Sequence, residues 1–235
     1  AGTWASSLEQ DPLDIYGSTE VDIYAGWTGK ISSGLTADVG LLYYVYPNGK
    51  VGKANVWEPY ASISTTMGPV SAKLGVAYAW DQKSLGGDDN LYIFTNLGVA
   101  IPETPVSLSA SLGYTDGALS PELLTGKGTG GGFDYSVGAT YFQDDRWTWR
   151  GGVAFDETPI PNPESRTARL PDNDRKWLAV GGSYHASKGM TVDFGYAHLF
   201  ISDPQINRTG PLGDVLIGTY SNTVDILSAQ LNWNY

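Results

Sequence analysis

Ser183 and His185 are the residues whose types and spacing come closest to a catalytic pair. They stand two positions apart, which on a strand places both side chains on one face, as a serine nucleophile and its general base require. The neighbouring sequence offers no identifiable third group that would orient the histidine. The other histidine, His198, follows a turn and lacks the spacing of a metal-ligand pair. We therefore expect no catalytic residues, no enzyme activity, no metal site and no cofactor.

Two further classes of chemistry are disfavoured by composition. The chain has no cysteine, so disulfides, thiolate nucleophiles and cysteine-bound metals are absent. The glycine-rich stretch Gly126–Gly132 lacks the Gly-Lys-Ser/Thr ending and the following helix of a phosphate-binding loop, and we expect it to be an outer loop. The formal net charge of −11 opposes binding to phosphate backbones, so no nucleic-acid partner is expected.

An alternation of apolar with polar or small residues dominates the chain. Between Val106 and Thr115, for example, Val, Leu, Ala and Tyr alternate with Ser, Gly and Thr. This period of two is typical of β-strands with one apolar and one polar face. It predicts about twelve strands, near residues 1–7, 16–29, 35–46, 56–67, 70–81, 91–100, 105–115, 132–142, 147–156, 176–186, 190–201 and 222–235.

The predicted connections alternate strictly between short and long. The short ones contain turn-forming residues and cover 29–34, 67–69, 102–105, 143–146 and 187–189. The long polar ones cover 8–15, 47–55, 82–90, 116–131, 157–175 and 202–221. Such asymmetry is typical of an outer-membrane barrel, which has tight periplasmic turns and longer extracellular loops. An even strand number then puts both chain termini on the periplasmic side.

Composition favours the same fold class over a soluble β-sandwich. Charged residues make up only 17% of the chain, against roughly 25% in soluble domains, and aromatic residues reach 12%. No apolar run is long enough for a transmembrane helix. The N-terminal residues lack the basic and apolar regions of a signal peptide, so any such peptide is expected to be already removed.

We therefore predict an all-β protein, a transmembrane antiparallel up-and-down β-barrel forming one domain over residues 1–235. Its apolar wall faces lipid, and the sheet closes because a bilayer does not tolerate unpaired backbone. Aromatic residues near strand ends are expected at the membrane interface, namely Trp27, Tyr43, Trp57, Trp80, Tyr141, Trp147, Trp149, Trp233 and Tyr235.

The polar wall then faces the lumen and is mostly acidic. The expected pore-lining residues are Glu20, Asp22, Asp38, Glu58, Lys73, Asp81, Asp134, Arg150, Asp156 and Asp193. Excess carboxylate on a pore wall favours cations, and many small inward residues leave volume for a narrow water-filled passage. The alternative interpretation is that these groups pair with one another and fill the barrel.

Two segments resemble known families. Glu20–Gly26 followed by Asp38–Pro47 resembles the TorF family of outer-membrane porins, and Gly2–Ser6 looks like an internal strand of that family. This resemblance covers roughly residues 1–115 and implies a porin.

The second half, about residues 133–235, resembles the C-terminal strands of the FadL family of outer-membrane long-chain fatty acid transporters. The resemblance lies in Trp149–Asp156, Pro159–Pro161, Leu170–Arg175 and Val192–Tyr196. It implies a transporter of hydrophobic substrates, although nothing corresponds to the N-terminal hatch of that family. Two different resemblances suggest a truncated, spliced or engineered chain with a seam at Gly126–Gly132.

The expected function is an outer-membrane channel of a Gram-negative bacterium that allows passive diffusion of small solutes, with a modest preference for cations. A FadL-like transporter of hydrophobic substrates and a non-conducting structural or engineered barrel remain alternatives. The expected partners are the lipid bilayer, the small solutes and the outer-membrane insertion machinery, which would recognise the C-terminal strand ending in Tyr235. Lipopolysaccharide is a further expected partner through Arg166, Arg169 and Arg175, unless these residues pair within their own loop.

Overall fold

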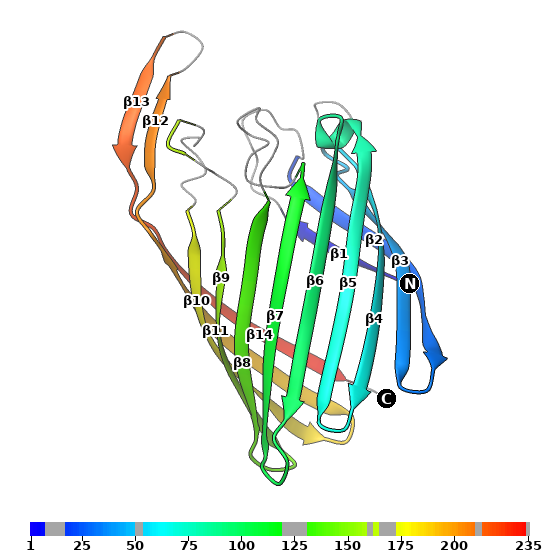
Figure 1. Ribbon diagram of the computed structural model, residues 1–235. Helices are drawn as coiled ribbons and strands as arrows, with labels where there is room; N and C mark the ends of the chain where they lie inside the picture. Colours follow the sequence, from blue (N-terminus) through cyan, green and yellow to red (C-terminus); the bar gives the residue numbers. More distant parts are fainter. Residues whose placement is uncertain are drawn as a thin grey trace.

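A computed structural model shows a single continuous antiparallel sheet that curls around a lumen (Figure 1). The structure describes residues 1–7, 17–49, 54–118, 131–158, 162–164, 173–209 and 213–233. The strands are β1 (Gly2–Ser7), β2 (Thr19–Ser32), β3 (Leu35–Val45), β4 (Val56–Met67), β5 (Val70–Gln82), β6 (Asp88–Ala100), β7 (Val106–Gly117), β8 (Gly132–Phe142), β9 (Trp147–Asp156), β10 (Arg175–Ser187), β11 (Met190–Ile201), β12 (Gln205–Thr209), β13 (Val215–Thr219) and β14 (Thr223–Trp233). The predicted all-β, up-and-down architecture is confirmed.

Strand order follows the chain, from β1 to β11 and then β14, so each strand pairs with its sequence neighbour. Tight turns join the strands at one end, here called the short-turn end. The longer connections lie at the other, the long-loop end (Figure 1). Among the described residues, no helix is long and apolar enough to cross a membrane.

The cross-strand register produces two chemically different walls. Leu112 pairs with Tyr135 on one wall, whereas the adjacent Ser111 pairs with Ser136 on the other. Side chains of the apolar wall are strongly exposed, as at Val137 (56%) and Val180 (54%). Among the described residues only six hydrophobic side chains are buried, namely Ala54, Val56, Ala79, Leu85, Leu199 and Ile206. Such an apolar exterior is stable against lipid and would be a liability in water.

The predicted loop at 202–221 is wrong in part, because a hairpin of β12 and β13 forms within it. This hairpin is a separate two-stranded sheet and stands beyond the ends of β10 and β11 at the long-loop end (Figure 1). The peptide nitrogen of Tyr220 donates to the carbonyl of Pro204 at its base (2.9 Å). Its strands are only five residues long, so they lack the extended alternation that identifies a spanning strand.

The predicted long connection at 82–90 is also wrong in part, because β5 extends to Gln82 and β6 begins at Asp88, which leaves 83–87 as the connection, with a 3-10 turn at Lys83–Leu85. Polar Asp88, Asp89 and Asn90 suggested a loop, yet they continue the strand at its rim. The ladder between β5 and β6 shifts register between Ala79 and Gln82, which absorbs an extra residue in β5.

The two outermost strands do not complete the predicted closure. Within the described part of the chain, β1 pairs only with β2 and β14 pairs only with β11. Strand β1 is short, at six residues, and its register with β2 puts Thr3, Ala5 and Ser7 on the wall that is apolar elsewhere. A lipid-facing strand would carry larger apolar side chains there.

Candidate functional site

The inner wall of the curled sheet carries most of the predicted pore-lining residues. Cross-strand pairing places nine of them on the polar wall, namely Glu20, Asp22, Asp38, Glu58, Lys73, Asp134, Arg150, Asp156 and Asp193. Asp81 lies within the register shift of β5, where simple alternation no longer fixes which wall a side chain joins. The inner wall is therefore the candidate site.

Tyrosines on the inner wall donate hydrogen bonds to carboxylates of neighbouring strands. Tyr44 Oη donates to Glu58 Oε2 at 2.7 Å, between β3 and β4. Tyr92 Oη reaches from β6 to Asp134 Oδ2 on β8 at 3.2 Å. These donors are neutral, so within the described part of the chain they bring no positive charge to the two carboxylates.

Glycines on the same wall let the aromatic rings lie flat against the sheet. A β-carbon added at Gly40 would come within 2.6 Å of the Tyr60 ring, and one at Gly75 would clash with the Phe94 ring. The Tyr60 hydroxyl then reaches Asp38 Oδ1 at 3.4 Å. Because the rings cover neighbouring glycines instead of projecting inward, they leave the middle of the lumen less obstructed.

A polar network ties the last strands together near the short-turn end. Ser183, only 1% exposed, accepts a hydrogen bond from Arg150 Nη1 (2.7 Å) and donates one to Asp193 Oδ1. Asn232 Nδ2 on β14 donates to Asp193 Oδ2 at 2.7 Å. The network thus links β9, β10, β11 and β14.

The serine and histidine considered for catalysis make separate contacts in the described structure. The Ser183 hydroxyl is engaged by Arg150 and Asp193, whereas His185 Nδ1 lies 3.0 Å from Thr191 Oγ1. His198 lies on the opposite wall and its Nδ1 is 2.8 Å from Asp225 Oδ1. The described residues contain no cluster of three or more groups that could hold a metal ion.

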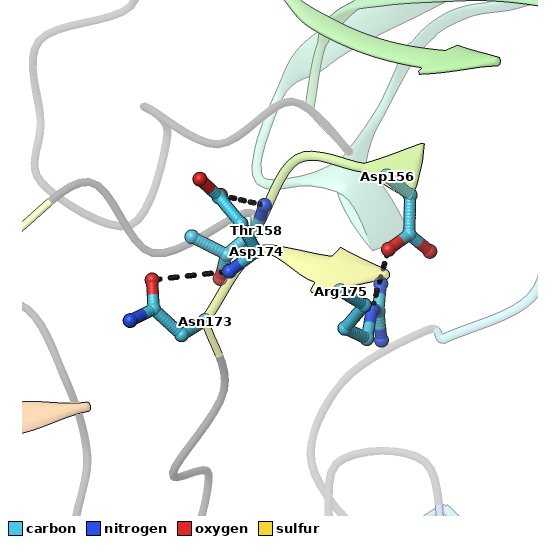
Figure 2. A network of polar contacts seen from close by, with 5 residues as sticks. All are labelled: Asp156, Thr158, Asn173, Asp174 and Arg175. Atoms are coloured by element: carbon cyan, nitrogen blue, oxygen red, sulfur yellow. Dashed lines mark hydrogen bonds and ion pairs between the residues drawn. The ribbon is translucent and has the colours of Figure 1, made fainter. Parts of the chain in front are cut away.

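Arg175 is an inner-wall residue that the sequence interpretation placed in an outer loop. It is the first residue of β10, and its Nε lies 2.9 Å from Asp156 Oδ1 (Figure 2). Beside it, Asp174 Oδ1 accepts from the peptide nitrogen of Thr158 at 3.0 Å, which joins the two ends of the β9–β10 connection. Arg166 and Arg169 lie outside the described residues.

Two other inner-wall charges were also missed, Lys30 of β2 and Asp88 of β6. Lys30 pairs with Thr36 and Asp88 pairs with Gln82. The alternation of β2 contained the signal for Lys30, because it continues through Thr28 to the turn. Asp88 could not be found, since the start of β6 was read as loop.

Aromatic residues form bands on the outer wall at both ends of the strands. At the short-turn end the rings of Trp147 and Trp149 stack with centroids 5.3 Å apart, and Trp149 Nε1 donates to Gln143 Oε1. At the long-loop end Tyr43 stacks on Trp57 at 3.8 Å. The other predicted interface residues that pairing places on the outer wall are Trp27, Tyr141 and Trp233. Trp80 lies within the register shift of β5, as Asp81 does, and Tyr235 lies outside the described residues.

The inner wall also has an apolar portion. Trp177, Leu199 and Val224 are cross-strand neighbours on β10, β11 and β14 near the long-loop end. Leu199 is 5% exposed, and Ile201 and Ile226 belong to the same wall. This apolar patch was not predicted, because the inner-wall positions of these strands change from polar to apolar residues only near the long-loop end.

Residues 1–183 match the sequence model of a family described as bacterial protein of unknown function (Gcw_chp). The chain belongs to the Gcw_chp family. The range matched by the Gcw_chp model includes the predicted seam at Gly126–Gly132, most of which lies outside the described residues. Neither the predicted seam nor the resemblance to the TorF family is confirmed.

Parts of this Gcw_chp chain are similar to named outer-membrane proteins. A stretch of 76 residues is 41% identical to the long-chain fatty acid transport protein of Escherichia coli, which covers 32% of this chain and 17% of the transporter. Another stretch of 106 residues is 31% identical to outer membrane protein P1 of Haemophilus influenzae. It covers 43% of this chain and 23% of protein P1. The matched stretches thus span less than a quarter of each relative.

Two crystal structures share the fold. A Pseudomonas aeruginosa FadL homologue matches 98% of this chain and 72% of its own, with a TM-score of 0.69 and 14% identity. The match to the P. putida toluene transporter TodX covers 99% of this chain and 78% of TodX, with a TM-score of 0.59 and 9% identity. The predicted FadL resemblance is therefore confirmed for the fold. Together with the apolar outer wall, these similarities identify a barrel protein of the bacterial outer membrane.

Proposed function

We propose that this protein is an outer-membrane channel through which small solutes diffuse passively, with a modest preference for cations. The observation that carries the proposal is the inner wall, where Glu58, Asp134 and Asp38 accept hydrogen bonds from tyrosine hydroxyls and form no ion pair with any cation of the described residues. A wall of negative charge raises the local concentration of cations and lowers that of anions.

The arrangement of the inner wall supports an open passage over a filled barrel. The flattened Tyr60 and Phe94 rings lie over Gly40 and Gly75. Twelve strands also enclose more space than the eight whose interior is just filled by side chains. The proposed orientation puts the tight turns and both chain termini in the periplasm and the long loops outside, as in other barrels of this class.

Single-channel recording in planar bilayers tests the proposal directly. The purified full chain should give stable open steps, with reversal potentials in a salt gradient shifted toward that of the cation. Glu58→Gln and Asp134→Asn together should reduce the shift, because each removes a charge while keeping the atoms that face tyrosine. Asp225→Asn is the matched control, since Asp225 lies on the outer wall. Folded protein that passes no current would disprove the channel.

A second candidate function is transport of hydrophobic molecules, as in the named relatives. The inner apolar patch of Trp177, Leu199, Ile201, Val224 and Ile226 favours it, because an aqueous pore does not need such a surface. Binding of a fluorescent long-chain fatty acid to the full chain tests this function. We expect weaker binding after Leu199→Asn if the patch is used, with Leu74→Asn on the outer wall as the control.

Lipopolysaccharide and the insertion machinery remain proposed partners. Arg175 is turned to the inner wall and pairs with Asp156, which makes it a poor ligand for an external phosphate. Lys176, the next residue, belongs to the outer wall at the long-loop end and is better placed for that contact. The apolar outer face of β14 suits recognition by the insertion machinery.

A further inference from the structure

The charges of the inner wall are divided along the length of the barrel. Among the described strand residues near the long-loop end, five carboxylates that the sequence predicted, and one that it missed, accompany a single cation, Arg175, which pairs with Asp156. The predicted carboxylates are Glu20 and Asp22 at the start of β2, Glu58 at the start of β4, Asp134 at the start of β8 and Asp156 at the end of β9. Asp88 at the start of β6 is the other. This half of the lumen is strongly negative.

The short-turn half has the opposite balance among the described strand residues. Lys73 lies three residues after the start of β5, Arg150 three residues after the start of β9, and Lys30 two residues before the end of β2. Two carboxylates accompany them, Asp38 and Asp193. This half is therefore neutral to positive.

Both central cations of the short-turn half are held against the wall by contacts within the barrel. Arg150 donates to the buried Ser183 hydroxyl, which in turn donates to Asp193, so its position is fixed and the nearby Asp193 carboxylate offsets part of its charge. The Nζ of Lys73 lies 5.7 Å from the centre of the Phe94 ring, whose face attracts a cation. The glycines opposite Arg150, Gly181 and Gly195, bring no side chain that would cover it.

We propose that Lys73 and Arg150 form a cationic zone below an acidic vestibule and make ion flow through this channel depend on direction. The inference rests on the proposed channel function and adds residues that determine its selectivity. When the field drives cations from the long-loop end, cations enter through the acidic half and anions through the basic half. Both then accumulate where the halves meet, and the current is larger. The reverse field depletes this region of ions.

The expected size follows from Coulomb interactions in water. One unit charge at about 10 Å changes the local concentration of a monovalent ion by about twofold. In 0.1 M KCl, where the screening length is about 10 Å, this factor falls to about 1.3-fold per charge, so two cations on the wall should give currents that differ about 1.5- to 2-fold between equal positive and negative voltages. In 1 M KCl, where the screening length falls to about 3 Å, the difference should largely disappear. A rectification that came from shape alone would persist.

Current–voltage curves of the reconstituted full chain test the proposal. Lys73→Gln and the double variant with Arg150→Gln should make the curve nearly symmetric in 0.1 M KCl. Lys73→Gln alone keeps the test valid if loss of the Arg150–Ser183 bond impairs folding. Lys176→Gln is the matched control, because it removes the same charge from the outer wall. Lys188→Cys, in the turn after β10, reports the orientation of the channel when an impermeant thiol reagent is added from one side.

The outcomes are distinct. A rectifying wild type that becomes symmetric in the lysine and arginine variants supports the proposal. A cation-preferring channel with symmetric currents, or with rectification unchanged in those variants, overturns it and leaves the proposed function intact. Folded protein without conductance overturns both.

Discussion

The ring of Tyr60 on β4 covers Gly40 on β3 so closely that a β-carbon at position 40 would stand 2.6 Å from the ring. The same tyrosine donates its hydroxyl to Asp38, two residues along β3 (3.4 Å). Glycine and carboxylate on one strand therefore fix the orientation of a large side chain on the next. The Tyr60 ring is thereby kept against the wall of the proposed channel.

Replacing Gly40 by leucine should force the Tyr60 ring away from the wall and into the lumen. We expect a clear fall in single-channel conductance, because a displaced ring obstructs the passage. The double variant Gly40→Leu/Tyr60→Ala should recover conductance, since the obstructing ring is gone. A single variant with unchanged conductance would show that the ring does not limit the pore.

Neighbouring residues on β7 should respond oppositely to the same substitution. Leu112→Arg places a charge on the lipid-facing wall near the middle of the strand and should cost about 2–4 kcal/mol of membrane stability. Ser111→Arg places it in the lumen and should leave insertion intact while reducing cation preference. Folding yield into vesicles and reversal potentials measure the two effects. Equal loss of insertion in both variants would contradict the assignment of the walls.

Removal of the Ser183 hydroxyl should loosen the short-turn end of the last strands. Ser183→Ala deprives Arg150 and Asp193 of a shared buried partner, and we expect a loss of about 1–3 kcal/mol in the free energy of unfolding. Urea titration in detergent or vesicles measures it. Ser228→Ala is the control, because its exposed hydroxyl makes only a 3.4 Å bond to the Gly195 carbonyl, and its effect should stay within about 0.5 kcal/mol.

The spanning strands were predictable because lipid imposes a simple rule on them. A strand between lipid and a lumen must alternate, and the predicted bounds 56–67, 132–142, 147–156 and 190–201 coincide with β4, β8, β9 and β11. Loop positions followed from the same alternation. The assignment of Glu58, Asp134 and Arg150 to the inner wall needed only this rule.

The remaining features depend on contacts that alternation does not encode. The hairpin of β12 and β13 lies beyond the strands of the main sheet, so no membrane constraint marks its sequence. Arg175 joins the inner wall because β10 begins one residue earlier than predicted and pairs there with Asp156, which accepts its hydrogen bond. The flattened Tyr60 ring similarly depends on a glycine from another strand.

The free edge of β14 leads to the last prediction. In the described structure this strand pairs only with β11, and the ladder runs from the pair of Phe200 and Thr223 to the pair of Met190 and Trp233. Every second peptide N–H of β14 therefore points away from the sheet. A bilayer does not tolerate such groups unpaired.

We therefore expect β14 to gain a second pairing partner in the membrane, with β1 as the candidate, because it is the other edge strand of the sheet and runs antiparallel to β14. Hydrogen exchange in lipid nanodiscs should then show similar protection for all amides between Leu227 and Trp233. The central amides of β11, which pairs on both sides, provide the reference for full protection. Rapid exchange at alternate positions of β14 would instead show that the edge stays open to water, as a lateral gap in the wall.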